Sequence, residues 1–170
     1  MKRTLQQATL IILGILLLLC TSCTEKNDDS SVSGKTCTVS IICTSVLTHK
    51  SDLLPEKEEI IPQNGYFTKE MTVVIGEEDT VFSVLQKLCR DRKMHLDFEF
   101  TPAYNSMFIK GIGNLYCGDC GAMSGWMFAV NKVLPSTSCD STPVKDGDTV
   151  EWLFICDYAT DLTAEYTWGE

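Results

Sequence analysis

Apolar and polar residues alternate along several segments of the chain, which is the pattern of β-strands with two different faces. In the first segment, residues 36–47, Cys37, Val39, Ile41 and Cys43 share one face. Similar alternation predicts further strands over 66–75 and 95–100. The segments 107–112, 126–130 and 149–156 are also predicted to be strands. The stretches between them contain Gly, Pro, Asn and charged residues, so they are predicted to be loops and turns.

One segment has the spacing of an amphipathic helix instead. From residue 81 onward, the apolar residues fall at i, i+3, i+4, i+7 and i+8, and they form a single stripe: Val81, Val84, Leu85, Leu88 and Cys89. Asp79 or Thr80 can cap the first free amides. Because the stripe must be buried on a sheet, the order strand, strand, helix, strands predicts an α+β domain. We expect a two-layer, β-grasp-like domain, with one helix packed on a mixed sheet.

The N-terminal residues have the layout of a secretory signal. Lys2 and Arg3 precede an uncharged apolar stretch over 8–19, which is shorter than the roughly 20 residues of a membrane span. The chain is therefore predicted to be exported. An uncleaved N-terminal anchor, or cleavage by a general signal peptidase, is the alternative interpretation.

The residues after this stretch resemble a bacterial lipoprotein processing site. They read Leu19-Cys20-Thr21-Ser22-Cys23. Cys23 is the predicted lipidation site because the small Ser22 precedes it, whereas the bulky Leu19 precedes Cys20. A palmitate-type anchor on Cys23 implies a lipoprotein on the extracytoplasmic face of the bacterial cell membrane, which it would contact through its lipid only.

These features divide the chain into four parts. We expect a lipoprotein signal peptide at 1–22, a flexible tether at 23–35, a folded domain at 36–157 and a C-terminal tail at 158–170. The tether is predicted because its residues are small, polar and without periodicity.

Charge and composition exclude several function classes. With 14 basic and 23 acidic residues, the net charge of the 170-residue chain is -9, which argues against a nucleic-acid partner because phosphate binding needs a basic face. His49 and His95 are the two histidines, and neither lies in a metal-type motif. Ser124 lacks the flanking pattern of a nucleophile elbow, and no phosphate loop occurs. The chain is therefore predicted to be a non-enzyme that holds no metal and no cofactor.

Two stretches near the C-terminus carry a family resemblance. Residues 121–131 read GAMSGWMFAVN and residues 145–152 read KDGDTVEW. They resemble the DUF4430 domain, which is similar to the C-terminal β-domain of transcobalamin and intrinsic factor. The chain departs from that pattern at Phe128, where Tyr is usual, and at Lys132, where Gly is usual. The resemblance spans roughly residues 36–157 and is most specific over 109–155.

The resemblance implies a non-catalytic binding module that captures a small ligand, with a corrinoid such as cobalamin as the leading candidate. In cobalamin carriers a helical domain completes the site, so a domain of this kind offers one half of it. Two alternatives remain: an envelope protein-interaction or adhesion module that binds a surface protein, and a thiol-disulfide redox protein that uses Cys117 and Cys120.

The candidate ligand-binding residues lie in or near the loop over 118–125, because long glycine-rich loops commonly form binding rims. They are Tyr116, Met123, Gly125, Trp126, Phe128 and Asn131. Each also has a structural interpretation. Trp126 suits a core position, Gly125 a bend in the backbone, and Asn131 a left-handed turn.

Nine cysteines occur, and setting aside Cys20 and Cys23 leaves seven, so at least one thiol stays unpaired. Export permits disulfides. Cys43 and Cys89 should both face the helix–sheet interface and form one candidate pair. Cys120 and Cys139 flank the strand over 126–130 and form the second. Buried thiols are the alternative to these bridges, and half a zinc site at Cys117 and Cys120 is the weakest interpretation.

Overall fold

The computed structural model of the chain describes residues 34–169. The predicted signal peptide, Cys20, Cys23 and all of the tether before Gly34 lie outside the described residues. None of the helices within residues 34–169 combines the length and the apolar character needed to cross a membrane.

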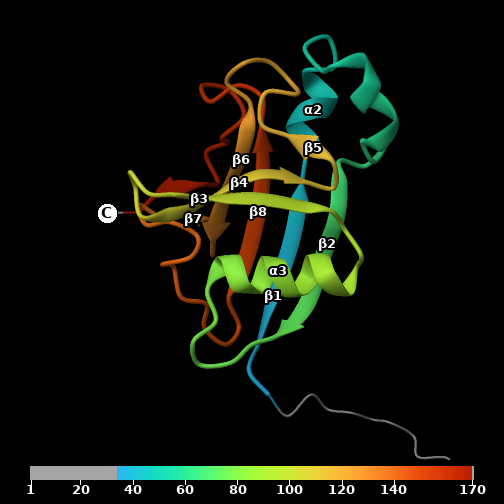
Figure 1. Cartoon of the computed structure of the whole chain (residues 1–170). Helices are drawn as coiled ribbons and strands as arrows, with labels where there is room; N and C mark the ends of the chain where they lie inside the picture. Colours follow the sequence, from blue (N-terminus) through green and yellow to red (C-terminus); the bar gives the residue numbers. More distant parts are fainter. Residues whose placement is uncertain (1–33, 170) are drawn as a thin grey trace, which may run out of the picture. The chain divides into compact units, whose positions relative to one another are not determined.

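A six-stranded mixed sheet forms the centre of the described domain (Figure 1). Its strands are β1 (Thr36–Ile42), β2 (Tyr66–Val74), β6 (Gly125–Val130), β7 (Val133–Leu134), β8 (Thr149–Ile155) and β9 (Thr167–Trp168). The order across the sheet is β2-β1-β8-β6-β7-β9. The central strands β1 and β8 are parallel, and β2 and β6 pair antiparallel with them on either side. The predicted α+β class and mixed sheet are therefore confirmed.

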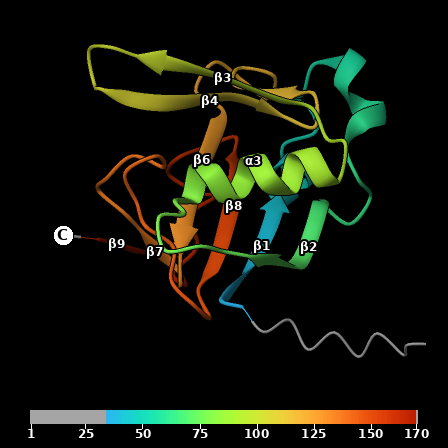
Figure 2. The same cartoon turned by 60° about the horizontal axis from the view of Figure 1, so that its bottom comes forward.

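Helix α3 (Val81–Asp91) lies across one face of this sheet (Figure 2). It begins where the sequence predicted, because Thr80 forms a capping box: its side chain accepts from the Ser83 amide, while the Ser83 hydroxyl accepts from the Thr80 amide. The predicted apolar stripe is buried, including Val84 and Leu85. Two short helices also occur, α2 (Thr44–Thr48) and the 3-10 helix η1 (Pro55–Ile60).

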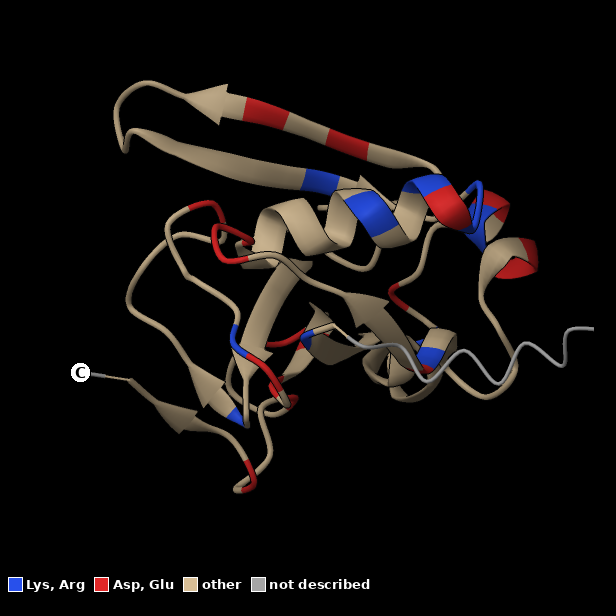
Figure 3. Ribbon diagram, turned by 90° about the horizontal axis from the view of Figure 1, so that it is seen from below, with Lys and Arg blue, Asp and Glu red and all other residues tan. Residues whose placement is uncertain are grey.

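A second, smaller sheet covers α3 on the side away from the main sheet (Figure 2). It contains β3 (Leu96–Thr101), β4 (Ser106–Ile112) and β5 (Leu115–Tyr116). On the β3–β4 hairpin, Lys110 lies 3.9 Å from Asp97 and 3.7 Å from Glu99. Figure 3 shows basic and acidic positions on the two strands of this hairpin. These charges therefore partly balance one another along the hairpin.

The first predicted strand is wrong beyond Ile42. Cys43 leaves the extended conformation, with φ -131° and ψ 32°, and α2 starts at Thr44. The cause is a close crossing of two backbones: the Cys43 amide donates to the Gly65 carbonyl at 2.7 Å, and a Cβ on Gly65 would lie 2.7 Å from the Thr44 side chain. Alternation of residue types cannot reveal such a crossing.

Both faces of the main sheet are covered. Val150, Trp152 and Phe154 of β8 pack into the core beneath α3, whereas Leu153 and Ile155 join a second apolar cluster on the opposite face. The residues expected to be a C-terminal tail cover part of that second face. Their Leu162 and Tyr166 pack against the second cluster, and β9 pairs with β7.

Candidate functional site

The second face of the main sheet holds a cavity of about 570 Å³. Its floor comes from β1 and β8, and residues 160–166 contribute one wall. We call it the sheet cavity. The lining residues that matter most below are Ile42, Tyr66, Glu70, Lys132, Glu151 and Tyr166. A volume of this size falls within the range of pockets that enclose small organic ligands.

The space exists because small side chains flank Glu151 on both neighbouring strands. Glu151 pairs with Ser40 of β1 on one side and with Ala129 of β6 on the other. Side chains directly opposite each other on paired strands lie on the same face of a sheet. Ser40, Glu151 and Ala129 therefore form a row across the second face, and the two short side chains leave room beside the carboxylate.

Glu151 is the central polar group of the sheet cavity. Its side chain is only 9% exposed, and its Oε1 atom accepts from Lys132 Nζ at 2.8 Å. Its Oε2 atom is buried, and no group in residues 34–169 donates a hydrogen bond to it. A buried carboxylate oxygen without a donor is costly, so the site has an unused capacity to accept a hydrogen bond.

Lys132 is held in place by several groups. Besides Glu151, its Nζ lies 3.4 Å from the Tyr166 hydroxyl, 3.5 Å from Glu165 Oε2 and 4.7 Å from the centre of the Tyr166 ring. Burial opposes its charge, but the hydrogen bonds to Glu151 and Tyr166 outweigh that effect and hold the pKa of Lys132 above its usual value. The ammonium is therefore a permanent part of this wall at neutral pH.

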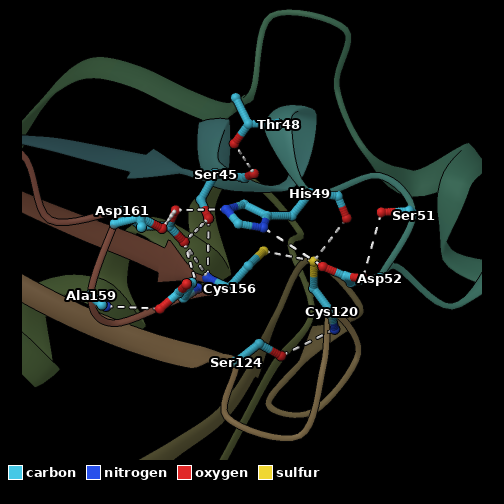
Figure 4. Close-up of polar contacts among 12 residues, drawn as sticks. Ser45, Thr48, His49, Ser51, Asp52, Cys120, Ser124, Cys156, Ala159 and Asp161 are labelled. Atoms are coloured by element: carbon cyan, nitrogen blue, oxygen red, sulfur yellow. Dashed lines mark hydrogen bonds and ion pairs between the residues drawn. The ribbon is translucent and has the colours of Figure 1, made fainter.

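Asp161 also lines the sheet cavity, and Figure 4 shows its contacts with Ser45, His49 and Cys156. Its Oδ2 atom accepts from the backbone amides of Cys156 and Asp157, both at 2.7 Å, and from the Ser45 hydroxyl. Its Oδ1 atom lies 2.9 Å from His49 Nε2. Burial alone would raise the pKa of Asp161, but these hydrogen bonds lower it. Asp161 therefore anchors the C-terminal segment to α2.

Three of the sequence-predicted binding residues have structural roles on the other side of the sheet or in a turn. The Trp126 indole is buried and donates to the Leu115 carbonyl at 2.9 Å. The centre of the Phe128 ring lies 5.4 Å from the centre of the Trp152 ring. Asn131 has φ 52° and its Oδ1 atom accepts from the Thr149 amide, which agrees with the turn interpretation.

The other three predicted residues lie on or beside the glycine-rich loop and do not converge. The Tyr116 hydroxyl lies 2.7 Å from His95 Nε2. Met123 is 81% exposed. A Cβ on Gly125 would lie 3.2 Å from the Cys117 sulfur, which explains the glycine as a close approach. Ligand binding by this group of six stays a prediction, and none of the six lines the sheet cavity.

All seven cysteines in the described part of the chain are free thiols. Cys43 and Cys89 both lie in the main core, as expected, and burial raises the pKa of each thiol to about 12. The predicted pairing of Cys120 with Cys139 is wrong. The Cys120 sulfur lies 2.7 Å from that of Cys156, while the Cys139 thiol faces the Met107 carbonyl at 3.6 Å.

Cys117 does not face Cys120 either. Its thiol points to the Ile109 carbonyl at 3.5 Å, so the CxxC spacing does not bring two sulfurs together here. Within residues 34–169, no group of three or more His, Cys, Asp or Glu side chains is arranged to hold a metal ion.

Comparison with known proteins confirms the family resemblance. Residues 78–155 match the model of DUF4430, a domain of unknown function. The matched segment runs from the cap of α3 to the end of β8 and includes both Lys132 and Glu151. A search of curated proteins finds no match.

Among solved structures, the chain is similar to a candidate metal binding protein from Ruminococcus gnavus ATCC 29149. The two are 19% identical, with a TM-score of 0.43, over 73% of this chain and 99% of that one.

Proposed function

We propose that the chain is a non-catalytic binding module, displayed as a lipoprotein on the outer side of the bacterial membrane, and that the sheet cavity is its ligand site. The observation that carries this proposal is the buried Glu151 carboxylate, which lines the cavity with one oxygen that no protein group satisfies. A ligand that donates a hydrogen bond there would relieve an existing cost. Because that oxygen is itself buried, side chains of the cavity lining would have to move aside for a ligand to reach it.

The composition of the lining favours a ligand with an amine or ammonium group on an apolar body. Four carboxylates line the cavity (Glu70, Glu151, Asp161 and Glu165) against two lysines (Lys69 and Lys132). The surplus of negative charge favours a cation, and a carboxylate forms a strong charge-assisted hydrogen bond with an ammonium group. Ile42 and Leu153 supply apolar contact, while the Tyr66 and Tyr166 rings already have Lys69 and Lys132 over their faces.

A corrinoid remains the ligand suggested by the resemblance to the transcobalamin β-domain, and the DUF4430 match supports testing it. A cavity of about 570 Å³ suits a ligand smaller than a complete corrinoid. A complete corrinoid would thus be held only in part and would need a second surface to complete its binding site. We therefore place a small amine ahead of cobalamin.

We also propose that the main sheet and helix α3 form a β-grasp core. The β1–β2 hairpin, helix α3, and the parallel pairing of β1 with β8 beside the antiparallel β6 support a β-grasp core. In this description the β3–β4–β5 sheet and the C-terminal segment are additions that cover α3 and the second face.

One observation favours the alternative of a protein-interaction module. The β3–β4 hairpin carries four exposed aromatic residues: Phe98, Phe100, Tyr104 and Phe108. Phe98 and Phe100 lie on one face of the hairpin, and Phe108, which is opposite Glu99, lies on the other. Exposed aromatic side chains are enriched at protein-binding surfaces. This surface is separate from the sheet cavity, so a partner protein and a small ligand are compatible.

Isothermal titration calorimetry on the purified protein tests the ligand class. The probes are 2-phenylethylamine and its alcohol counterpart 2-phenylethanol, which share an apolar body and differ at the polar head. We expect the amine to bind at least tenfold more tightly than the alcohol, and cyanocobalamin to bind more weakly than the amine. Equal heats for the amine and the alcohol would remove the proposed role of Glu151, and tight cobalamin binding would restore the corrinoid hypothesis.

A further inference from the structure

Two cysteine side chains that are 36 residues apart in the sequence meet at the C-terminal end of β8. Cys120 belongs to the glycine-rich loop after β5, and Cys156 directly follows β8. The Cys156 thiol donates to the Cys120 sulfur at 2.7 Å (Figure 4). Both residues are buried. This is closer than two unbonded sulfur atoms normally approach, so the backbones already hold the two side chains within bonding reach of each other.

Backbone hydrogen bonds fix both positions independently of the sulfur contact. The Cys120 amide donates to the Ser124 hydroxyl at 3.0 Å, and Cys120 also forms an isolated bridge with Leu53. The Cys156 amide donates to Asp161 Oδ2 at 2.7 Å and to the Ser45 hydroxyl at 3.0 Å. The juxtaposition of the sulfurs is therefore imposed by the fold of the loop and the strand.

The remaining core thiols differ from this pair. Cys117 and Cys139 each point to a backbone carbonyl, of Ile109 and Met107 respectively. Cys120 has such a contact too, with the His49 carbonyl at 3.6 Å, in addition to its contact with the Cys156 sulfur. Cys37, Cys43 and Cys89 are enclosed in the main core. In the described part of the chain, Cys120 and Cys156 are the two cysteines joined by a sulfur–sulfur contact.

We propose that Cys120 and Cys156 are a disulfide-forming pair, oxidised to one intramolecular bridge by thiol–disulfide exchange with an external disulfide. The Cys120 thiolate attacks one sulfur of the oxidant and forms a mixed disulfide, and one thiolate of the oxidant leaves and takes up a proton. Cys156 then loses its proton and attacks the Cys120 sulfur, displacing the second half of the oxidant as a thiol. Two S–H bonds of the protein are replaced by one S–S bond, and the oxidant disulfide is reduced to two thiols.

The contact between the two sulfur atoms determines which cysteine attacks the oxidant first. Burial raises the pKa of Cys120, while the hydrogen bond from Cys156 acts in the opposite direction and stabilises the Cys120 thiolate. For Cys156, burial and the same hydrogen bond both raise the pKa. Since both sulfurs are enclosed, the exchange takes place while the loop is still closing or when it opens, and the finished bridge is then shielded from reductants.

The bridge would brace one wall of the sheet cavity. Cys156 is the last residue before the segment that covers the second face, and Asp161 holds that segment through the Cys156 amide. A covalent link from Cys156 to the loop fixes the point from which the wall departs. The bridge is independent of ligand binding, so either proposal can fail without the other.

Peptide mapping of the full chain tests the pairing directly. The protein is equilibrated with oxidised and reduced glutathione, its remaining thiols are blocked with iodoacetamide, and it is digested with trypsin without reduction. Cleavage after Lys110, Lys132 and Lys145 places Cys120, Cys139 and Cys156 on three different peptides. The Cys117→Ser variant leaves Cys120 as the one cysteine of its peptide. We expect the 111–132 and 146–170 peptides to be joined and two hydrogen atoms lighter than their sum.

Thermal unfolding adds a second readout. A reductant should lower the Tm of the wild type and of Cys117→Ser by roughly 5–15 °C, because the bridge closes a loop of some tens of residues. It should not shift the Tm of Cys156→Ser. Full alkylation of both cysteines under oxidising glutathione, or a link from Cys120 to the Cys139 peptide, would overturn the proposal. Because the mapping needs only the wild type and Cys117→Ser, it stays decisive even where Cys156→Ser fails to fold.

Discussion

Lys132 Nζ lies 2.8 Å from Glu151 Oε1, and this ion pair joins the turn after β6 to the middle of β8. Lys132 occupies a left-handed position, with φ 67°, at which the DUF4430 pattern usually has Gly. A non-glycine residue there costs about 1 kcal/mol of backbone strain. In exchange, the chain places a permanent cation against a buried carboxylate that lines a cavity, so the departure from the family pattern coincides with the proposed site.

Glu151→Gln tests the carboxylate directly. We expect the affinity for 2-phenylethylamine to fall roughly 10-fold to 100-fold, because a hydrogen bond to a charged group contributes about 1.5–3 kcal/mol. Glu165→Gln is the matched control, since Glu165 lies near the same lysine but is more than half exposed. Calorimetric titration of both variants measures the difference, and equal losses in the two would contradict a specific role for Glu151.

Substitutions of Lys132 separate the charge from the backbone strain. Lys132→Met should lower the free energy of unfolding by about 1–3 kcal/mol, because it leaves the buried Glu151 charge without its partner. Lys132→Gly removes the same pair but also relieves the left-handed strain, so it should be more stable than Lys132→Met by about 0.5–1 kcal/mol. Urea unfolding of both variants provides the comparison. A larger loss for Lys132→Gly would show that the backbone there is not strained.

The ion pair should also show coupling. In the Lys132→Met background, adding Glu151→Gln removes the unpaired charge, so the double variant should recover part of the lost stability. Strictly additive losses from the two substitutions would mean that the two side chains do not stabilise each other in solution.

The lowered pKa of Asp161 predicts how the stability of the protein depends on pH. Its pKa is lower in the folded protein than the usual value near 3.9, so the unfolded chain binds more protons as the pH falls below about 5. The stabilisation from Asp161 is fully present at pH values above the pKa that this residue has in the unfolded chain. It is lost as the pH falls through the lower pKa that Asp161 has in the folded protein. Asp161→Asn should therefore lower the Tm at pH 7 and flatten its decline between pH 5 and pH 3. The exposed neighbour Asp157→Asn is the control, and a wild-type slope in Asp161→Asn would be the contrary result.

Substitutions in the glycine-rich loop and the core distinguish the sheet cavity from the binding rim expected from sequence. Met123→Ala should leave amine affinity unchanged, because Met123 does not line the cavity. Trp126→Phe should lower the free energy of unfolding by about 1 kcal/mol through loss of the bond to Leu115, again without changing affinity. A selective loss of affinity in Met123→Ala would move the site to the loop.

Most of the fold could be predicted from local patterns. The α3 stripe, its Thr80 cap and the apolar run of β8 depend on neighbours a few residues apart, so the sequence displays them directly. The end of β1 at Ile42 depends instead on the approach of Gly65, which lies far along the chain. The role of residues 160–166 as a wall was missed for the same reason.

The candidate site was harder to predict because its residues come from distant segments. Glu151 did give a signal, as a lone charge in the otherwise apolar run of β8, and Lys132 gave another as a departure from the family pattern. Neither signal reveals that the two side chains meet. The pairing of Cys120 with Cys156 likewise required the positions of the loop and the strand end, since spacing alone suggested Cys139.

The most direct test of the central claim is a ¹H–¹⁵N NMR titration of the labelled protein with 2-phenylethylamine. The account predicts that the largest shifts will fall on backbone amides around the sheet cavity, at Ser40, Ile42, Glu151, Leu153 and Tyr166. In Glu151→Gln the same shifts should need a roughly 10-fold to 100-fold higher amine concentration. Shifts confined to the loop over 117–125, or none at saturating amine, would contradict it.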